Sequence, residues 1–183
     1  TNKAIIEEHW TYAIRSAAAT TLPLKWLGPK KPKIIGIVGV GTMATNALRC
    51  LVELYDCIEE IRCTSRSPET RQAFSEKWSN ALGINVVPKN SIEEVVTGAD
   101  IGVGGTTSDE IMCREPWLKP GGTYVSFSRR EFDPKGWPLM DKVVVDSWEM
   151  NMLMKHFRAS AEAGIFTHDM LHGEIHQLIS GDI

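Results

Sequence analysis

The sequence predicts an α/β protein built on a doubly wound parallel sheet, and three observations lead to that prediction. Short apolar runs of strand length recur along the chain, the first of them at 34–38 (IIGIV). Such runs are typical of strands that are buried on both faces. Helical patterns alternate with them, as parallel strands require. A glycine-rich loop joins the first strand to the helix that follows it.

The composition is that of a folded domain without nucleic-acid or membrane character. The chain has 183 residues, of which 43% are hydrophobic, and a net charge of -3 from 20 basic and 23 acidic residues. It has no basic field, charged tail, signal peptide or apolar run of membrane-spanning length. We therefore expect a cytoplasmic protein with neither a nucleic-acid partner nor a membrane. The four cysteines show no zinc spacing and indicate reduced thiols.

The first element is a helical pattern over residues 3–20 that carries Arg15 among alanines. Small residues allow close packing against a neighbour. An arginine among them either meets an anionic partner or extends its charged end into solvent. The loop at 28–32 (GPKKP) ends this segment, and the first strand follows.

The loop after the first strand has the spacing G-x-G-x-x-A. Gly39 permits a tight turn, Gly41 lets the backbone approach a pyrophosphate, and Ala44 lets the helix pack close to the strand. The N-terminus of the helix then presents N–H groups to the phosphates. Because the loop follows a strand and opens a helix, it predicts a Rossmann nucleotide-binding unit rather than a turn without a ligand. The assigned phosphate loop is Gly39, Gly41, Thr42, Met43 and Ala44.

The second strand, at 61–64, leads into Ser65, Arg66 and Ser67. NAD-selective folds place an acid here to hold the ribose 2′-hydroxyl, and this chain has none. A guanidinium can hold a 2′-phosphate and stack on adenine. The sequence therefore favours NADP(H) over NAD(H). The alternative for Arg66 is a solvated charge ahead of the next helix.

The remaining elements continue the alternation of strands and helices. We expect strands at 84–87, 100–104, 123–128 and 143–145, and helices at 68–82, 91–96, 148–163 and 169–179. Ser91 is placed to begin a helix, and Gly83 and Gly181 to end two others. Thr106 and Thr107 follow the 100–104 strand at the edge where such sheets bind ligands, and we assign both to the cofactor site.

Three histidines lie four residues apart in the last predicted helix. His168, His172 and His176 would share one face of it, and two such imidazoles can bind a transition metal. Gly173 interrupts this helix, however, and the metalloprotease pattern H-E-x-x-H is absent. We therefore expect no metal site.

Six segments, in this order, resemble the ornithine cyclodeaminase and mu-crystallin family. They are YAIRSAAAT at 12–20, IGIVGVGTMA at 35–44, GADIGVGGTTS at 98–108, WLKPGGTYVS at 117–126, VVVDS at 143–147 and EIHQLISGD at 174–182. The resemblance implies a linking helix at 1–28, a Rossmann domain at 29–165 and a C-terminal helix at 166–183 that returns toward a substrate domain. Family members are considerably longer. We therefore expect a fragment or a truncated homologue that lacks most of the substrate domain.

The resemblance also implies roles for single residues. Arg15 corresponds to the arginine that meets the substrate carboxylate beside the cofactor, and Thr106 to a cofactor-contacting threonine. Val125, Ser126 and Phe127 correspond to the strand near the nicotinamide. The phosphate loop and the end of the second strand match the family's dinucleotide site, and NADP-binding members of mu-crystallin type also lack the acid there.

The chain departs from the family at the catalytic acid. Cyclodeaminases have a G-x-D-x-P-G-K loop whose Asp handles protons, whereas this chain has FSRREFDP at 127–134. An ungapped alignment places Glu131 on that Asp. A gapped alignment deletes the loop and leaves Glu131 and Asp133 as candidates. The difference argues against ornithine cyclisation, and we assign catalysis to Glu131 and Arg15.

The predicted function is that of an NADP(H)-dependent oxidoreductase acting on an amino acid or a cyclic imine. Arg15 would clamp the carboxylate and Glu131 would move the proton. Two alternatives stay open: an NAD-dependent cyclodeaminase that releases ammonia, and a mu-crystallin-like, NADPH-dependent binding protein with little activity. We expect a homodimer of the full-length protein, and dinucleotide binding without turnover by these 183 residues alone.

Overall fold

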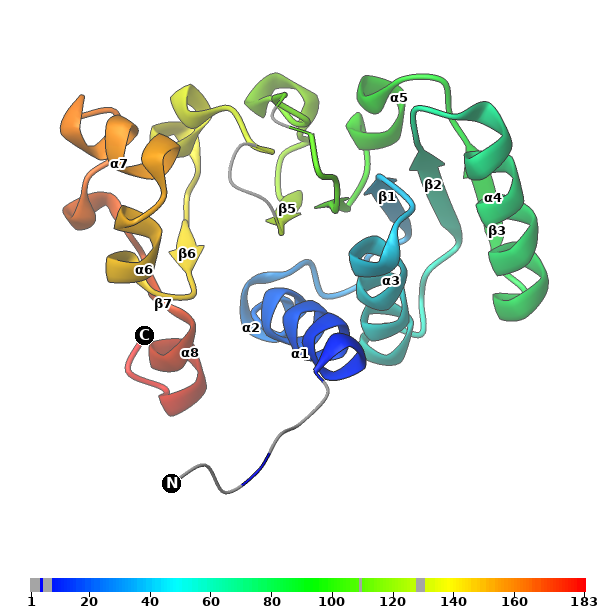
Figure 1. The fold of residues 1–183 in the computed structure, drawn as a ribbon, viewed down its shortest axis with the longest axis horizontal. Helices are drawn as coiled ribbons and strands as arrows, with labels where there is room; N and C mark the ends of the chain where they lie inside the picture. Colours follow the sequence, from blue (N-terminus) through cyan, green and yellow to red (C-terminus); the bar gives the residue numbers. More distant parts are fainter. Residues whose placement is uncertain (1–3, 5–7, 109, 128–130) are drawn as a thin grey trace.

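The computed structural model describes residues 4, 8–108, 110–127 and 131–183. Its centre is a five-stranded parallel sheet with the strand order β3-β2-β1-β4-β5 (Figure 1). The strands are β1 (Ile34–Val38), β2 (Glu60–Thr64), β3 (Asn85–Pro88), β4 (Ile101–Gly104) and β5 (Thr123–Ser126). The order runs outward from β1 in both directions, which confirms the doubly wound fold and places the switch point between β1 and β4.

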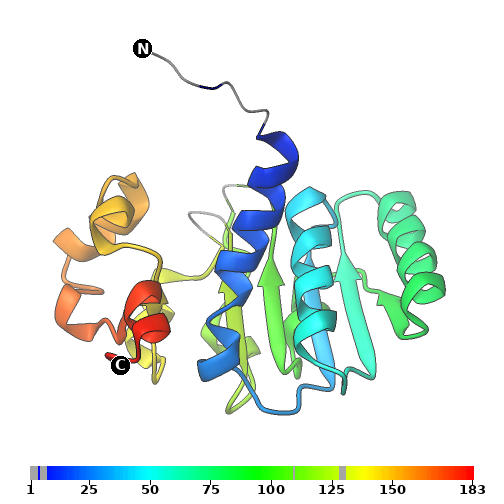
Figure 2. The same ribbon diagram turned by 90° about the horizontal axis from the view of Figure 1, so that it is seen from below.

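Helices cover both faces of this sheet. Figure 2 looks onto the face that carries α1, α3 and α4, and α5 covers the opposite face. Each of the two faces has its own cluster of buried apolar side chains. Ile35 and Ile37 point into the first cluster and Val38 into the second, as expected of a strand buried on both sides. The helices are α1 (His9–Thr21), α2 (Leu24–Leu27), α3 (Thr42–Leu54), α4 (Pro68–Leu82) and α5 (Ile92–Val96).

The predicted starts and ends of these helices are largely confirmed. The hydroxyl of Ser67 accepts the N–H of Thr70 at the start of α4, and that of Ser91 accepts the N–H of Glu94 at the start of α5. Gly83 ends α4 in the left-handed conformation, with φ at +66°. The start predicted for the first helix, at residue 3, falls partly on residues outside the described ranges.

The C-terminal third departs from the prediction. β6 (Val144–Val145) does not extend the main sheet but pairs with β7 (Gly173–Glu174) in a separate parallel sheet. A new parallel neighbour for β5 needs a crossover connection, usually a helix. The segment after β5 holds instead the short 3-10 helix η2 (Pro134–Leu139), which contains a second proline, Pro138. Another 3-10 helix, η1 (Glu115–Trp117), lies between β4 and β5.

Both helices predicted after residue 148 are divided. The first becomes α6 (Trp148–Met152) and α7 (Lys155–Glu162), and the second becomes η3 (His168–Met170), β7 and α8 (Ile175–Ser180). The prediction of one helical face with three histidines is therefore wrong, because Gly173 and its neighbours are extended.

Aromatic packing accounts for these divisions. Trp148 and Phe157 lie edge to face with ring centroids 5.1 Å apart, and Trp137 packs on Phe166 at 5.3 Å. The chain turns between α6 and α7 so that these rings meet.

Among the helices in the described part of the chain, none combines the length and apolar character that crossing a bilayer needs.

Candidate dinucleotide-binding site

The turn after β1 has the conformation that the glycine spacing predicts. Gly39 has a φ of +85°, a region that favours glycine. A Cβ on Gly39 would lie 2.8 Å from the carbonyl oxygen of Gly105 and 2.9 Å from Cγ2 of Thr106. The N–H of Gly39 donates to the carbonyl of Thr64 at 2.9 Å. The turn is therefore fixed between the carboxyl ends of β2 and β4.

The start of α3 leaves room for a phosphate. A Cβ on Gly41 would meet nothing within 4 Å, so the space beside the helix N-terminus is open. Ala44 is fully buried, and a Cβ on Gly105 would lie 3.0 Å from its methyl group. Thr42 is exposed and Met43 half-buried in the first turn of α3. These residues fit a pyrophosphate bound at a helix N-terminus.

The end of β2 forms a second part of the site. Ser65 donates its hydroxyl hydrogen bond to the carbonyl of Ser67 at 2.8 Å, and Arg66 is exposed. The hydroxyl of Ser67 caps α4 and donates to the carboxylate of Glu69 at 2.6 Å. This hydrogen bond holds the pKa of Glu69 below its ordinary value. An acid therefore lies near the predicted ribose position, but on α4 rather than at the strand end.

Sequence reasoning missed a second guanidinium at this place. Nη1 of Arg71 donates to the carbonyl of Ser65 at 3.0 Å, and Nη2 donates to Oδ1 of Asn90 at 2.7 Å. Arg71 thus ties the end of β2 to the loop after β3. Its position one turn into a predicted helix was the available signal.

The ends of β4 and β5 meet on the carboxylate of Glu131. Oε1 accepts the N–H of Thr106 at 2.9 Å. Oε2 accepts the hydroxyl of Ser126 at 2.8 Å and the N–H of Phe127 at 3.0 Å. Glu131 has no exposed surface (0%). The structure thus brings four predicted site residues into one hydrogen-bonded cluster.

Two residues that the sequence did not single out shape this cluster. A Cβ on Gly104 would lie 2.5 Å from Oε2 of Glu131 and 2.5 Å from the hydroxyl oxygen of Tyr124. That hydroxyl is buried and has no hydrogen-bond partner among the described residues. Burial, with the charges of Glu131 and Cys113 adding to it, raises the pKa of Tyr124 well above its ordinary value. The Gly104-Gly105 pair at the strand end was the signal in the sequence.

The other predicted site residues have separate surroundings. Arg15 is exposed on α1, with its guanidinium 4.6 Å above the ring of Tyr12. Val125 is buried in the first apolar cluster, and Thr107 is exposed. Among the described contacts, none joins Arg15 to the carboxylate cluster. Its place in the substrate pocket therefore stays a prediction.

Asp133, the second candidate acid, has a local structural role. Its carboxylate accepts the N–H of Lys135 at the start of η2 at 3.1 Å, and it lies 3.2 Å from the guanidinium of Arg114. This capping geometry explains an acid at this position without any reaction.

Comparison with known proteins finds relatives along the whole chain. Residues 1–183 match the model of the ornithine cyclodeaminase/mu-crystallin family. The chain is 27% identical over 182 residues to N-((2S)-2-amino-2-carboxyethyl)-L-glutamate dehydrogenase of Staphylococcus aureus, covering 98% of this chain and 54% of that protein. It is 29% identical over 150 residues to ketimine reductase mu-crystallin of Rattus norvegicus, covering 80% and 46%.

A solved structure extends the likeness to three dimensions. The Delta(1)-pyrroline-2-carboxylate reductase of Thermococcus litoralis, in complex with NADH and L-proline, superposes with a TM-score of 0.85 at 27% identity. The superposition covers 96% of this chain and 55% of that one. The chain thus spans about half the length of the relatives it matches.

Proposed function

The chain belongs to the ornithine cyclodeaminase/mu-crystallin family, and we propose that it works in an NADP(H)-dependent oxidoreductase acting on an amino acid or a cyclic imine. The observation that carries the proposal is the phosphate loop, where Gly39 turns against Thr106 and Gly41 leaves the N-terminus of α3 open. The relatives named above are a dehydrogenase of an amino-acid derivative and reductases of a ketimine and a pyrroline carboxylate. Those names support a substrate that reacts at a Cα–N bond.

The proposal assigns the substrate carboxylate to Arg15. A bound nicotinamide would exchange the hydride with the substrate carbon. An exposed guanidinium such as that of Arg15 can grip a carboxylate with two parallel hydrogen bonds and so orient the substrate. The transfer of a proton by Glu131 stays a prediction. Its buried carboxylate, which accepts three hydrogen bonds from described residues, supports a different role that is argued below.

The preference for NADP(H) rests on the end of β2. Arg66 is exposed there, and no acid occupies positions 65–67. A guanidinium at this place attracts a 2′-phosphate. The carboxylate of Glu69 acts against it, but a hydrogen bond already engages this group with Ser67.

Calorimetric titration of the chain with NADPH and NADH tests the proposal. We expect NADPH to bind more tightly, and Arg66→Ala to weaken NADPH by about 1–3 kcal/mol, the scale of a charged hydrogen bond, with little effect on NADH. Arg158→Ala, an exposed change on α7, is the matched control and should alter neither affinity. Tighter binding of NADH would overturn the NADP(H) preference, and binding of neither would overturn the function.

Turnover is assayed on the protein at the length its gene encodes. We expect NADPH oxidation with pyrroline- or piperideine-2-carboxylate, or with a 2-oxo acid and an amine. Release of ammonia from ornithine without net change in NADH would instead identify a cyclodeaminase.

A further inference from the structure

We propose that Glu131 is a positioning residue that fixes the nicotinamide half of the dinucleotide site by holding the ends of β4 and β5 together. The inference rests on the proposed function, because it needs a dinucleotide across this edge of the sheet. It assigns the carboxylate the positioning of the nicotinamide half of the cofactor, in place of the predicted proton transfer.

The carboxylate acts where the backbone ladder of the two strands stops. Gly104 and Ser126 are the last paired residues of β4 and β5. The N–H groups of Thr106 and Phe127 lie beyond that pair, and one carboxylate accepts both. The N–H of Phe127 is shared, because it also donates a longer hydrogen bond, of 3.3 Å, to the carbonyl of Gly104. Glu131 therefore continues the pairing of the two strands past the end of the sheet.

The position of the carboxylate is tightly determined. Glu131 has no exposed surface, and its own backbone carbonyl accepts the N–H groups of Met112 and Cys113 at 2.8 and 2.7 Å. The absence of a side chain at Gly104 leaves the space that Oε2 occupies. A buried carboxylate is stable only where hydrogen-bond donors surround it. If its charge is removed, the hydrogen bonds from Thr106, Ser126 and Phe127 are all weakened.

The effect should reach one half of the cofactor more than the other. In this fold the dinucleotide lies across the switch point, with its adenosine half at β1–β2 and its nicotinamide half on the side of β4 and β5. Thr106 and Phe127 are on the second side, while Ser65 and Arg66 are on the first. Thr106 also packs against the turn at Gly39, so its placement limits where the phosphates leave the loop.

The test compares a whole dinucleotide with its adenosine half. Glu131→Gln keeps the shape but turns an NH₂ group toward at least one donor of the cluster. We expect the affinity for NADPH to fall at least tenfold, while adenosine 2′,5′-bisphosphate binds within about twofold of the unmodified chain. A merely structural role would weaken both ligands alike.

The matched control removes a buried hydrogen bond at β3, the edge strand farthest from β5. Ser75 is buried in α4 and donates to the carbonyl of Val86 in β3 at 2.6 Å. Ser75→Ala should lower stability while leaving the ratio of the two affinities unchanged. This separates a general loss of stability from a local effect on the nicotinamide half.

Further outcomes decide the remaining cases. If Glu131→Gln does not fold, Ser126→Ala is tested instead, because it removes one donor to Oε2 of Glu131. A loss of NADPH affinity of about threefold, with unchanged affinity for adenosine 2′,5′-bisphosphate, would then support the proposal. Equal losses for both ligands, or no loss for NADPH, overturn the role of Glu131. An unmodified chain that binds neither NADPH nor NADH overturns the proposed function itself, which is a separate result.

Discussion

Each edge of the main sheet is closed by a carboxylate, but the two carboxylates have different surroundings. At the amino edge, Oδ2 of Asp100 accepts the N–H groups of Lys33 and Ile34, both at 2.8 Å, and Oδ1 lies 2.5 Å from the ammonium of Lys119. At the carboxyl edge, Glu131 is fully buried and bonds the ends of two strands. The same chemical group thus joins backbone segments at both ends.

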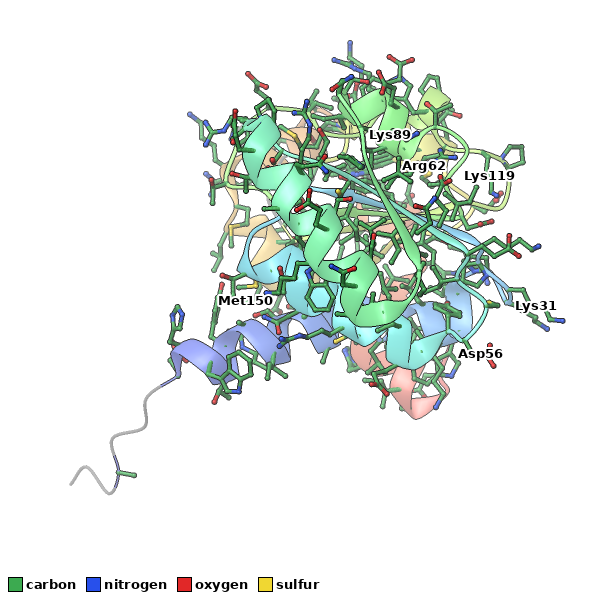
Figure 3. All side chains as sticks on the ribbon, turned by 90° about the vertical axis from the view of Figure 1, so that its right-hand side faces the viewer. Lys31, Asp56, Arg62, Lys89, Lys119 and Met150 are labelled. Carbon is green, nitrogen blue, oxygen red and sulfur yellow. The ribbon has the colours of Figure 1, made fainter. Side chains whose placement is uncertain are left out.

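The difference lies in access to solvent. The side chain of Asp100 is 15% exposed and that of its partner Lys119 is 37% exposed. Figure 3 shows Lys119 on the same side of the molecule as Lys31 and Asp56, at the edge where the strands begin. The amino-edge carboxylate therefore stabilises the sheet in contact with water, whereas the buried one shapes the edge where ligands of such folds bind.

The largest effect is expected for Gly104→Ala at the carboxyl edge. The new methyl group would lie 2.5 Å from both Oε2 of Glu131 and the hydroxyl of Tyr124, so one of them must move. Overpacking combined with a displaced carboxylate should cost about 3 kcal/mol, measured by urea unfolding. Gly41→Ala is the control, because its new methyl group would lie in open space. This variant should keep the stability of the unmodified chain but bind the dinucleotide more weakly. Equal stability of the two variants would contradict the crowding at Gly104.

The next effect is expected for Asp100→Asn at the amino edge. Burial opposes its ionisation, but hydrogen bonds from Lys119, Ile34 and Lys33 outweigh burial and hold the pKa of Asp100 below its ordinary value. The charge therefore stabilises the fold above the unfolded pKa, and this contribution is lost as pH falls below about 4. We expect a loss of about 2 kcal/mol at pH 7 that shrinks in acid. Dinucleotide affinity should be unchanged, and a weaker affinity would argue against separate roles for the edges.

Alkaline pH should instead weaken the carboxyl edge. Burial raises the pKa of the Cys113 thiol from 9.0 to about 12. Burial also raises the pKa of the Tyr124 hydroxyl, which lies beside Glu131. The folded chain thus holds protons that the unfolded chain releases above pH 9, so stability falls as pH rises. Each such group contributes about 1.4 kcal/mol per pH unit. Unfolding free energies from pH 8 to 11 should decline less steeply in Cys113→Ala; an unchanged slope would refute the assignment.

The smallest effect is expected for Lys119→Ala. Removal of this ammonium leaves Asp100 with its two backbone donors. A partly exposed ion pair contributes about 0.5 kcal/mol, and salt screens it. Urea unfolding should show that the stability difference between Lys119→Ala and the unmodified chain, present at about 0.1 M salt, disappears at about 1 M salt. A loss that persists at high salt would indicate a packing role for the lysine stem.

The sequence predicts the main sheet well because its signals are local. Apolar runs mark the strands, and Ser67, Gly83 and Ser91 mark helix ends through hydrogen bonds and backbone angles that involve near neighbours. The C-terminal third could not be predicted in this way. There the chain path depends on rings such as Trp148 and Phe166, which meet only after folding.

In the candidate site too, the features that depend on local sequence could be predicted, and those that depend on tertiary contacts could not. Spacing alone predicts the turn at Gly39, since a positive φ is a property of one residue. The burial of Glu131 and the contacts of Arg71 depend on which loops lie over the strand ends. No pattern within a short window of sequence records that arrangement.

The aromatic rings of the C-terminal third form a second core with consequences for cooperativity. They gather side chains between residues 137 and 168, whereas the first cluster of the sheet draws on residues 24–125. Trp137 links the aromatic group to the sheet, because it packs on Phe157 and also against the second cluster, on the face covered by α5. Cores with few shared side chains open as separate units. We therefore expect the two cores to unfold at different temperatures, so that one melting temperature would not describe the molecule, and Trp137 to couple their opening.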